Sequence, residues 1–324
     1  MRKHELQTFS NVPSTVKQSF SAVGQNSSHG MSSIVLTGSN VSSSDSSNST
    51  LVYNFPNSVS FTNHELAVSS ISMYYSWFNI GDSTTTLNNN QFSYTWVVGG
   101  TTTTYQVIIP SGIYEISDIN NFFQFTMIQN GTYLINSAGQ NVYYAELLVN
   151  VNLYSVDINT FPVPIALPTG YTTPLANPAT GALVWGGFPT QTFNPLLTFP
   201  ATNNFYKLVG YAAGFATSQN TGLNTNLTYH SSVSPQVQPN PTLFLTCNFV
   251  NNIYSNPSTV IFAITPTGAI GSQILIQPPE FTYNNIQGTT ASLIFQLRGK
   301  DGNVIKIQDT NLTFVLAIRE KASV

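Results

Sequence analysis

The chain has 324 residues and a formal net charge of -3, and only 6% of its residues are Asp, Glu, Lys or Arg. Ordinary soluble domains carry roughly 25% of these residues, so the surface must be built from Asn, Ser, Thr, Gln and Tyr. General acid–base catalysis and metal ligation draw on residue types that are scarce here. The composition therefore argues against an enzyme or a cofactor and favours self-association, because few charges keep neighbouring copies apart.

The first segment, residues 1–50, is rich in Ser and Asn and has few apolar residues. This composition cannot bury enough surface to offset chain entropy, so we predict an N-terminal arm that lies against other chains. Only the run Ile34, Val35 and Leu36 could add a strand to a sheet. Arg2 and Lys3 are followed by polar residues rather than an apolar run, which predicts no signal peptide and synthesis in the cytosol.

From Leu51 onward, aromatic and β-branched residues alternate with turn clusters, which is typical of antiparallel strands. Strands are expected at 51–55, 65–77, 91–98, 104–109, 132–135 and 142–154. One helix is predicted from Asp118 to about Gln129, with Ser117 as its N-cap and Asn130–Gly131 as its stop.

The next stretch, residues 161–200, contains eight prolines and several aromatic residues. Because long loops in compact domains are usually functional or disordered, the embedded aromatics indicate a packed surface insertion. A short helix or strand is expected at 203–213, a polar loop at 216–241, and strands at 242–250 and 260–265.

The end of the chain carries the clearest strand pattern. Strands at 292–297 and 304–308 flank a turn at Asp301–Gly302, which is a hairpin signal, and 312–318 completes this part. Phe314, Leu316 and Ile318 alternate with smaller or polar residues, so they should point into the core. The whole pattern predicts an all-β chain, a β-sandwich of two antiparallel sheets with long loop insertions and one short helix.

Reactive residues are sparse and show no catalytic spacing. Cys247, the single cysteine, lies in an apolar run and is best explained as a buried small side chain. The four histidines are His4, His29, His64 and His230. Glu115 and Asp118 form the only close pair of carboxylates, and the helix N-terminus accounts for Asp118. No residue is therefore predicted to be catalytic, cofactor-binding or metal-binding.

Basic residues are concentrated at the two ends of the chain. Between Val16 and Leu297 only Lys17 and Lys207 are basic. Nucleic-acid binding normally requires a basic stripe that neutralises several phosphates, so direct genome or other nucleic-acid contact is not expected of the body of the chain. No apolar run is long enough to suggest a transmembrane segment.

Four segments, taken in order, resemble the minor capsid or penton jelly-roll proteins of polinton-like viruses, virophages and related large DNA viruses. They are 73–80 (MYYSWFNI), 109–120 (IPSGIYEISDIN), 274–281 (ILIQPPEF) and 309–319 (DTNLTFVLAIR). The similarity covers residues 51–318. It implies a single jelly-roll capsid domain at 51–324 behind the 1–50 arm, with the 161–200 stretch as an insertion between strands.

The resemblance further implies a structural virion protein, synthesised in the host cytoplasm and located in the capsid of an icosahedral particle. It would form the pentameric vertex capsomer, contact the major capsid protein and meet other minor capsid proteins. The alternative is a receptor- or glycan-binding spike or adhesin domain on a virion or cell surface, in which aromatic loops such as 161–200 contact the ligand. The arm lacks a basic cluster, which departs from the family pattern and argues against direct genome contact.

Overall fold

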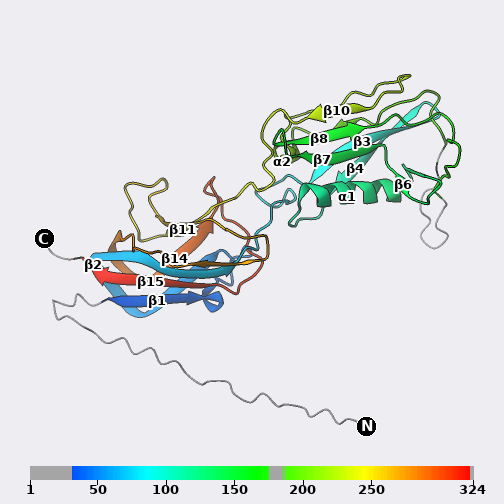
Figure 1. Cartoon of the computed structure of the whole chain (residues 1–324). Coiled ribbons are helices and arrows are strands. Elements are labelled where there is room, and N and C mark those ends of the chain that lie inside the picture. The colour runs from blue at the N-terminus through cyan, green and yellow to red at the C-terminus, as the bar shows by residue number, and fades with distance from the viewer. Residues whose placement is uncertain (1–30, 175–184, 186, 322–324) are drawn as a thin grey trace, which may run out of the picture.

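The structure is a computed structural model that describes residues 31–174, 185 and 187–321. Its strands pair antiparallel throughout this part of the chain, and the expected all-β class with curled antiparallel sheets is confirmed. The described residues form two lobes (Figure 1). We name residues 31–77 and 240–321 the terminal lobe and residues 78–239 the central lobe.

The terminal lobe is one curled sheet around a hydrophobic core. Its strands are β1 (Ser32–Thr37), β2 (Thr50–Tyr74), β11 (Leu243–Cys247), β12 (Val260–Ile264), β13 (Gln273–Ile276), β14 (Asn284–Arg298) and β15 (Thr313–Glu320), with one 3-10 turn at Gly38–Asn40. They follow the order β1-β15-β2-β14-β11-β12, and β13 also pairs with β2.

The long strand β2 is the centre of this sheet. Residues 50–66 of β2 pair with β14, and residues 64–72 pair with β15. The sequence predicted two strands, 51–55 and 65–77, where the structure has one continuous strand. Pro56 falls where the register between β2 and β14 shifts, a position that tolerates a residue without a backbone N–H.

Strand β1 corrects the expectation for the N-terminal arm. The run Ile34 to Leu36 does add a strand to a sheet, but to the sheet of its own chain, where β1 pairs with β15. Ile34 and Leu36 are buried in the core of the terminal lobe. The prediction that residues 1–50 lie against other chains is therefore wrong for residues 31–50, because alternation buries two apolar side chains there; residues 1–30 lie outside the described part.

The central lobe contains the remaining elements and has hydrophobic clusters of its own. These elements are β3 (Gln91–Val98), β4 (Thr101–Ile108), α1 (Ile116–Gln129), β5 (Leu134–Ile135), β6 (Asn141–Val142), β7 (Ala145–Asn150), β8 (Ser155–Thr160), β9 (Leu197–Thr198), α2 (Phe205–Val209) and β10 (Leu227–His230). Two three-stranded sheets, β10-β8-β7 and β4-β3-β9, contribute side chains to the same core.

Helix α1 begins two residues earlier than its sequence pattern suggested. Its N-cap is Glu115 rather than Ser117, and the Asp118 carboxylate accepts a hydrogen bond from the Glu115 N–H at 2.9 Å. Ile119, Phe123 and Met127 are buried as the helical periodicity predicted. The acidic side chains at 115 and 118 thus serve the helix start, where negative charge is favoured.

The C-terminal elements are partly as expected. The turn at Asp301–Gly302 is present and the Gly299 N–H donates to Asn303 O at 2.8 Å. Residues 304–308 make only isolated bridges, to Arg298 and Trp77, and form no regular strand. Strand β15 instead lies between β1 and β2. Phe314, Leu316 and Ile318 are buried, which confirms their predicted orientation.

The Pro-rich stretch packs into the central lobe. Trp185, Phe193 and Phe199 are buried, and Phe161 and Phe188 are half-buried against the same clusters. This supports the packed insertion; residues 175–184 and 186 lie outside the described part. The 203–213 segment contains the short helix α2, and the 216–241 segment, expected as a loop, includes β10.

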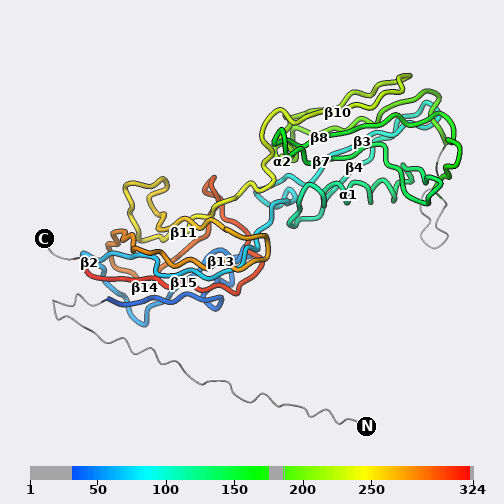
Figure 2. The backbone as a smooth tube through the Cα atoms, in the orientation of Figure 1, coloured from blue at the N-terminus to red at the C-terminus, as the bar shows by residue number. Residues whose placement is uncertain are grey.

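Two adjacent chain segments connect the lobes, and they can be followed in Figure 2. The Trp77 Nε1–H donates to Asn240 O at 3.0 Å, and Gln238 Nε2 donates to Tyr75 Oη at 2.6 Å. Asn79 is buried, with Nδ2 donating to Tyr114 O at 2.7 Å and to Val237 O at 2.8 Å. Side-chain hydrogen bonds therefore tie the outgoing segment to the returning one, and we call this region the neck.

Candidate interaction surfaces

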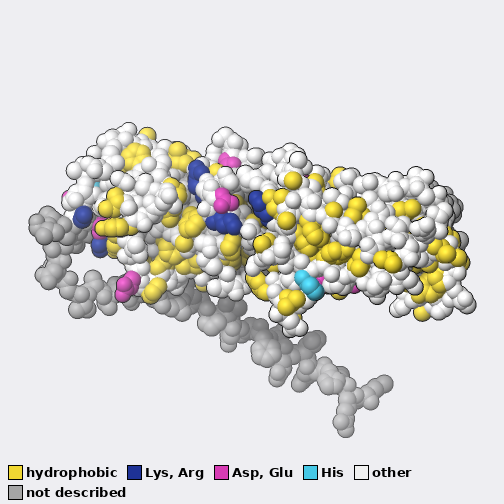
Figure 3. Space-filling model, turned by 90° about the horizontal axis from the view of Figure 1, so that it is seen from above, with side chains coloured by type: hydrophobic (Ala, Val, Ile, Leu, Met, Phe, Trp, Pro, Cys, Tyr) yellow, Lys and Arg dark blue, Asp and Glu magenta, His cyan; other side chains and the backbone are white. Residues whose placement is uncertain are grey.

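The few charges are distributed unevenly over the described surface. The central lobe has these charged residues: Asp82, Glu115, Asp118, Glu146, Asp157 and Lys207. On the face drawn in Figure 3, charged side chains gather near the neck and at the far end of the terminal lobe, and the remaining surface is mostly uncharged. A surface with so little charge offers weak repulsion to a neighbouring molecule.

The single cysteine has the surroundings expected of a structural residue. Cys247 is buried in the core of the terminal lobe, and burial raises the pKa of its thiol to about 11. A nucleophilic cysteine needs a lowered pKa, because the thiolate is the reactive form. His64 lies on β2 and His230 on β10 of the other lobe, and neither has a hydrogen bond to Cys247 among those of the described residues; His4 and His29 lie outside this part.

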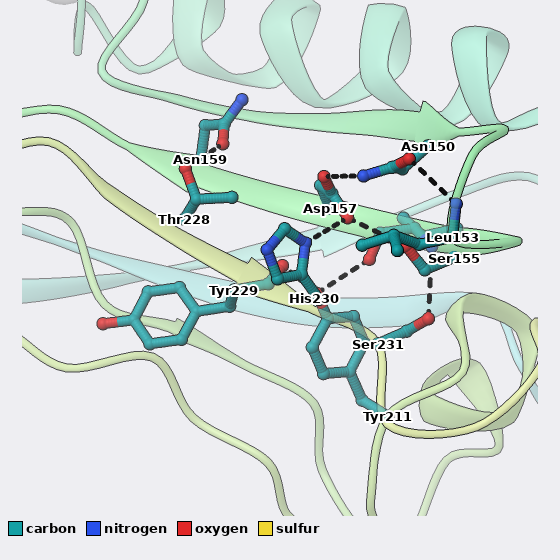
Figure 4. A network of polar contacts seen from close by, with 11 residues as sticks. Asn150, Leu153, Ser155, Asp157, Asn159, Tyr211, Thr228, Tyr229, His230 and Ser231 are labelled. Carbon is teal, nitrogen blue, oxygen red and sulfur yellow. Dashed lines mark hydrogen bonds and ion pairs between the residues drawn. The ribbon is translucent and has the colours of Figure 1, made fainter.

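A polar network covers the outer side of the β10-β8-β7 sheet (Figure 4). The buried Asp157 on β8 accepts hydrogen bonds from His230 Nδ1 at 2.9 Å, Ser155 Oγ at 3.0 Å and Asn150 Nδ2 at 2.9 Å. Asn150 Oδ1 in turn accepts from the Leu153 N–H at 3.2 Å. The network therefore links β10, β8 and the turn of the β7–β8 hairpin.

A catalytic histidine–aspartate pair also needs a nucleophile next to the histidine. A base of this kind activates a nucleophile through its second ring nitrogen, and no hydrogen bond of the described residues involves His230 Nε2. Thr228 Oγ1, further along β10, donates to Asn159 Oδ1 at 2.8 Å. These cross-strand contacts fasten the edge strand β10 to β8, which is a structural use of the pair.

Burial opposes the ionisation of Asp157, but hydrogen bonds from His230, Asn150 and Ser155 outweigh it and lower the pKa of this carboxyl below 3.8. A lowered folded-state pKa means that ionised Asp157 stabilises the fold above the unfolded-state pKa. That stability is lost as the pH falls through the folded-state pKa. We expect Asp157→Asn to be less stable than the parent at pH 7, and the difference to shrink below about pH 4.

Urea unfolding of both chains between pH 7 and pH 3 measures this difference. The matched control is Glu115→Gln, because Glu115 is an exposed carboxylate at the N-cap of α1. At pH 7 this variant should lose less free energy of unfolding than Asp157→Asn does. A stability difference for Asp157→Asn that stays constant down to pH 3 would contradict the assignment.

A groove in the terminal lobe has a mostly amide and aromatic lining and a volume of about 890 Å³. Tyr283, which lines the groove, has the Arg319 guanidinium stacked 3.6 Å from its ring centroid, and this guanidinium contacts the Glu65 carboxylate at 2.6 Å. This ion pair joins β15 to β2, which are neighbours in the sheet. The ion pair therefore links the two strands, and the Glu65 carboxylate is paired with Arg319 rather than available as an acid or base.

Exposed apolar side chains are the most prominent surface feature of the described residues. Two groups have the highest exposure: Val151 at 80% and Tyr154 at 74% on the β7–β8 turn, and Ile253 at 76% and Tyr254 at 94% after β11. Tyrosine is enriched among the residues that anchor protein interfaces. Sequence patterning missed both groups, because it placed 142–154 in one strand and had no signal at 253–254.

The described part of the chain contains neither a metal-binding cluster nor a membrane-spanning helix. Nowhere in it do three or more His, Cys, Asp or Glu side chains gather in a way that could hold a metal ion. Neither of its helices has the length and apolar character to cross a membrane.

No protein-family model matches the sequence, and no curated protein matches it. Among solved structures, a crystal structure of selenomethionine-labelled mavirus penton protein matches the fold with a TM-score of 0.41 and 9% sequence identity. The match covers 90% of this chain and 99% of that chain. A likeness at this level assigns neither a family nor an activity to the chain.

Proposed function

We propose that the chain is a structural virion protein, the penton capsomer of an icosahedral capsid, which self-assembles as a homopentamer and contacts the major capsid protein. The observation that carries the proposal is an all-β surface with almost no charge and with large apolar side chains exposed on both lobes. The free energy falls when a neighbouring subunit covers such side chains and removes them from water.

The sheet edges support the same proposal. Strand β4 is an edge strand of the central lobe and has the sequence TTTTYQVI, without charge or proline. Monomeric proteins usually protect an edge of this kind with lysine, proline or a bulge. An edge left unprotected over eight residues suits a protein whose neighbours cover it.

Three of the four segments that carry the family resemblance supply core residues, whereas 274–281 is largely exposed after Ile274. Residues 73–80 span the end of β2 and the neck, and residues 309–319 contain most of β15. Tyr75 and Trp77 are buried, so these aromatics serve packing rather than ligand binding. The pentamer, the major capsid protein and other minor capsid proteins as partners, the 51–324 capsid domain and the virion location are inferences from this resemblance.

The receptor-binding alternative named 161–200 as an example of an aromatic loop that would contact the ligand. The described aromatics there are buried or half-buried in the central lobe, so this stretch offers no aromatic platform in its described part. The vertex-capsomer proposal is therefore the better supported of the two.

Light scattering of the purified chain, alone and with a candidate major capsid protein, tests the proposal. We expect a cyclic oligomer of the chain alone at high protein concentration, and a larger complex when the major capsid protein is added. A chain that stays monomeric in both conditions would rule out the capsomer role.

A further inference from the structure

The loop after β11, residues 251–258 (NNIYSNPS), projects from the terminal lobe; it is uncharged, and its large apolar side chains are Ile253 and Tyr254. Asn252 holds it: its N–H donates to Ser258 O at 2.7 Å, and its Oδ1 accepts from the Tyr254 N–H at 3.0 Å. Ile253 and Tyr254 stand at the tip and are almost uncovered by their own chain. In Figure 1 the loop following β11 stands out from the terminal lobe. We call residues 251–258 the projection.

A groove of matching character lies at the neck-facing end of the central lobe. It has a volume of about 590 Å³ and lies between the β7–β8 hairpin and the returning neck segment 235–241. The apolar lining includes Ile116, Val149, Val151, Tyr154, Pro235 and Val237. No Asp, Glu, Lys or Arg lines it, and none occurs in the projection. We call this cavity the hairpin groove.

The hairpin that lines the groove is held in a fixed conformation. Asp157 accepts from Asn150, whose Oδ1 accepts from the Leu153 N–H, so the network of Figure 4 extends into the turn. Tyr154 has φ of 50°, a left-handed conformation that is unfavourable for a residue with a Cβ. Backbone held in such a conformation clusters at functional sites, and here it fixes a side chain that is 74% exposed.

We propose that the projection of one copy inserts into the hairpin groove of the next copy, with Ile253 and Tyr254 as the anchors. This deepens the proposed function and rests on it, because it specifies the contact through which the subunits assemble. The occupant is a second copy because one chain carries both parts: two exposed apolar side chains on an uncharged loop, and an uncharged groove with an apolar lining. Rigid partners also lose little conformational entropy on binding.

The two surfaces differ, so the contact is heterologous. A heterologous contact repeated around an axis closes into a ring when the rotation allows it. Each copy then uses its projection on one neighbour and its groove on the other. In a symmetric dimer, by contrast, both copies use the same surface for the contact.

Two variants test the contact. The projection variant carries Ile253→Ser and Tyr254→Ser, and the groove variant carries Val149→Asn and Val151→Asn; all four side chains are exposed, so folding should survive. The control variant carries Ile165→Ser and Leu223→Ser, which removes two other exposed apolar side chains of the central lobe, 56% and 53% exposed. Circular dichroism verifies the fold, and sedimentation velocity at several concentrations measures assembly.

Each test variant alone should sediment as a monomer, and the concentration needed for assembly should rise on the order of 30-fold or more, the effect of losing an anchor residue. The control variant should assemble like the parent. An equimolar mixture of the two test variants should form a dimer and nothing larger, because only one intact projection and one intact groove remain per pair.

The outcomes separate this inference from the proposed function. A parent chain that never assembles overturns both. A parent that assembles while the folded test variants assemble equally well overturns the projection–groove contact alone. Folded test variants that are monomeric and stay monomeric when mixed show that the two surfaces do not bind each other. If the groove variant assembles normally but no longer binds the major capsid protein, the groove is the site for that partner, and the inference is also overturned.

Discussion

Phe314→Ala is expected to destabilise the chain by about 3–5 kcal/mol. Phe314 is fully buried on β15, opposite Leu36 of β1 and Ile71 of β2, both of which are also fully buried. Removal of the ring leaves a cavity between three neighbouring strands, which the sheet cannot close without losing its pairing. Because domains are stable by only about 5–15 kcal/mol, the variant should lose much of its stability and, in the proposed capsomer role, fail to enter particles.

Urea unfolding of the parent and the variant measures this loss directly. Val315→Thr is the matched control, because residue 315 is half-buried on the other face of the same strand and should change stability by less than about 1 kcal/mol. If Phe314→Ala unfolded at the same urea concentration as the parent and assembled normally, the position of β15 between β1 and β2 would be wrong.

Asn79→Ala is expected to have the second large effect, by releasing the neck. The side chain of Asn79 is 1% exposed and makes three hydrogen bonds with backbone groups of Tyr114 and Val237. Without it, the Tyr114 N–H and two carbonyl oxygens are buried without partners. Each such group costs about 1–3 kcal/mol, so a loss on the order of 3 kcal/mol is expected.

The loss should be accompanied by faster proteolysis at residues 235–241, since Asn79 holds this returning segment to the outgoing one. Limited proteolysis and urea unfolding together measure both effects. Asn141→Ala, an exposed asparagine of the central lobe, is the control and should change neither. Unchanged stability and unchanged cleavage in Asn79→Ala would show that the neck does not depend on this amide.

Much of the strand pattern was predictable because it depends on neighbours in sequence. Alternation in 312–318 predicted which side chains of β15 face the core, and helical spacing predicted the buried face of α1. The same reasoning failed for the joining of two predicted strands into β2. A strand continues where partners on both sides supply hydrogen bonds, and those partners, β14 and β15, lie more than 200 residues away.

The interaction surfaces required the fold. Composition alone predicted a surface poor in charge and a tendency to associate, since charge counts do not depend on folding. It could not show that Ile253 and Tyr254 are exposed, because apolar residues in a short loop are as often buried as free. Nor could it bring residues 149–154 beside 235–241, which the pairing of β7, β8 and β10 positions.

The sequence by itself therefore determined the all-β class, the scarcity of catalytic groups and the inward face of the last strand, each of which follows from composition or from a period of two along a strand. Only the tertiary structure decided that β1 belongs to its own sheet, that residues 80–239 enclose a core of their own, and which apolar side chains remain uncovered. Burial is set by contacts between residues distant in sequence, and such contacts exist only once the chain has folded.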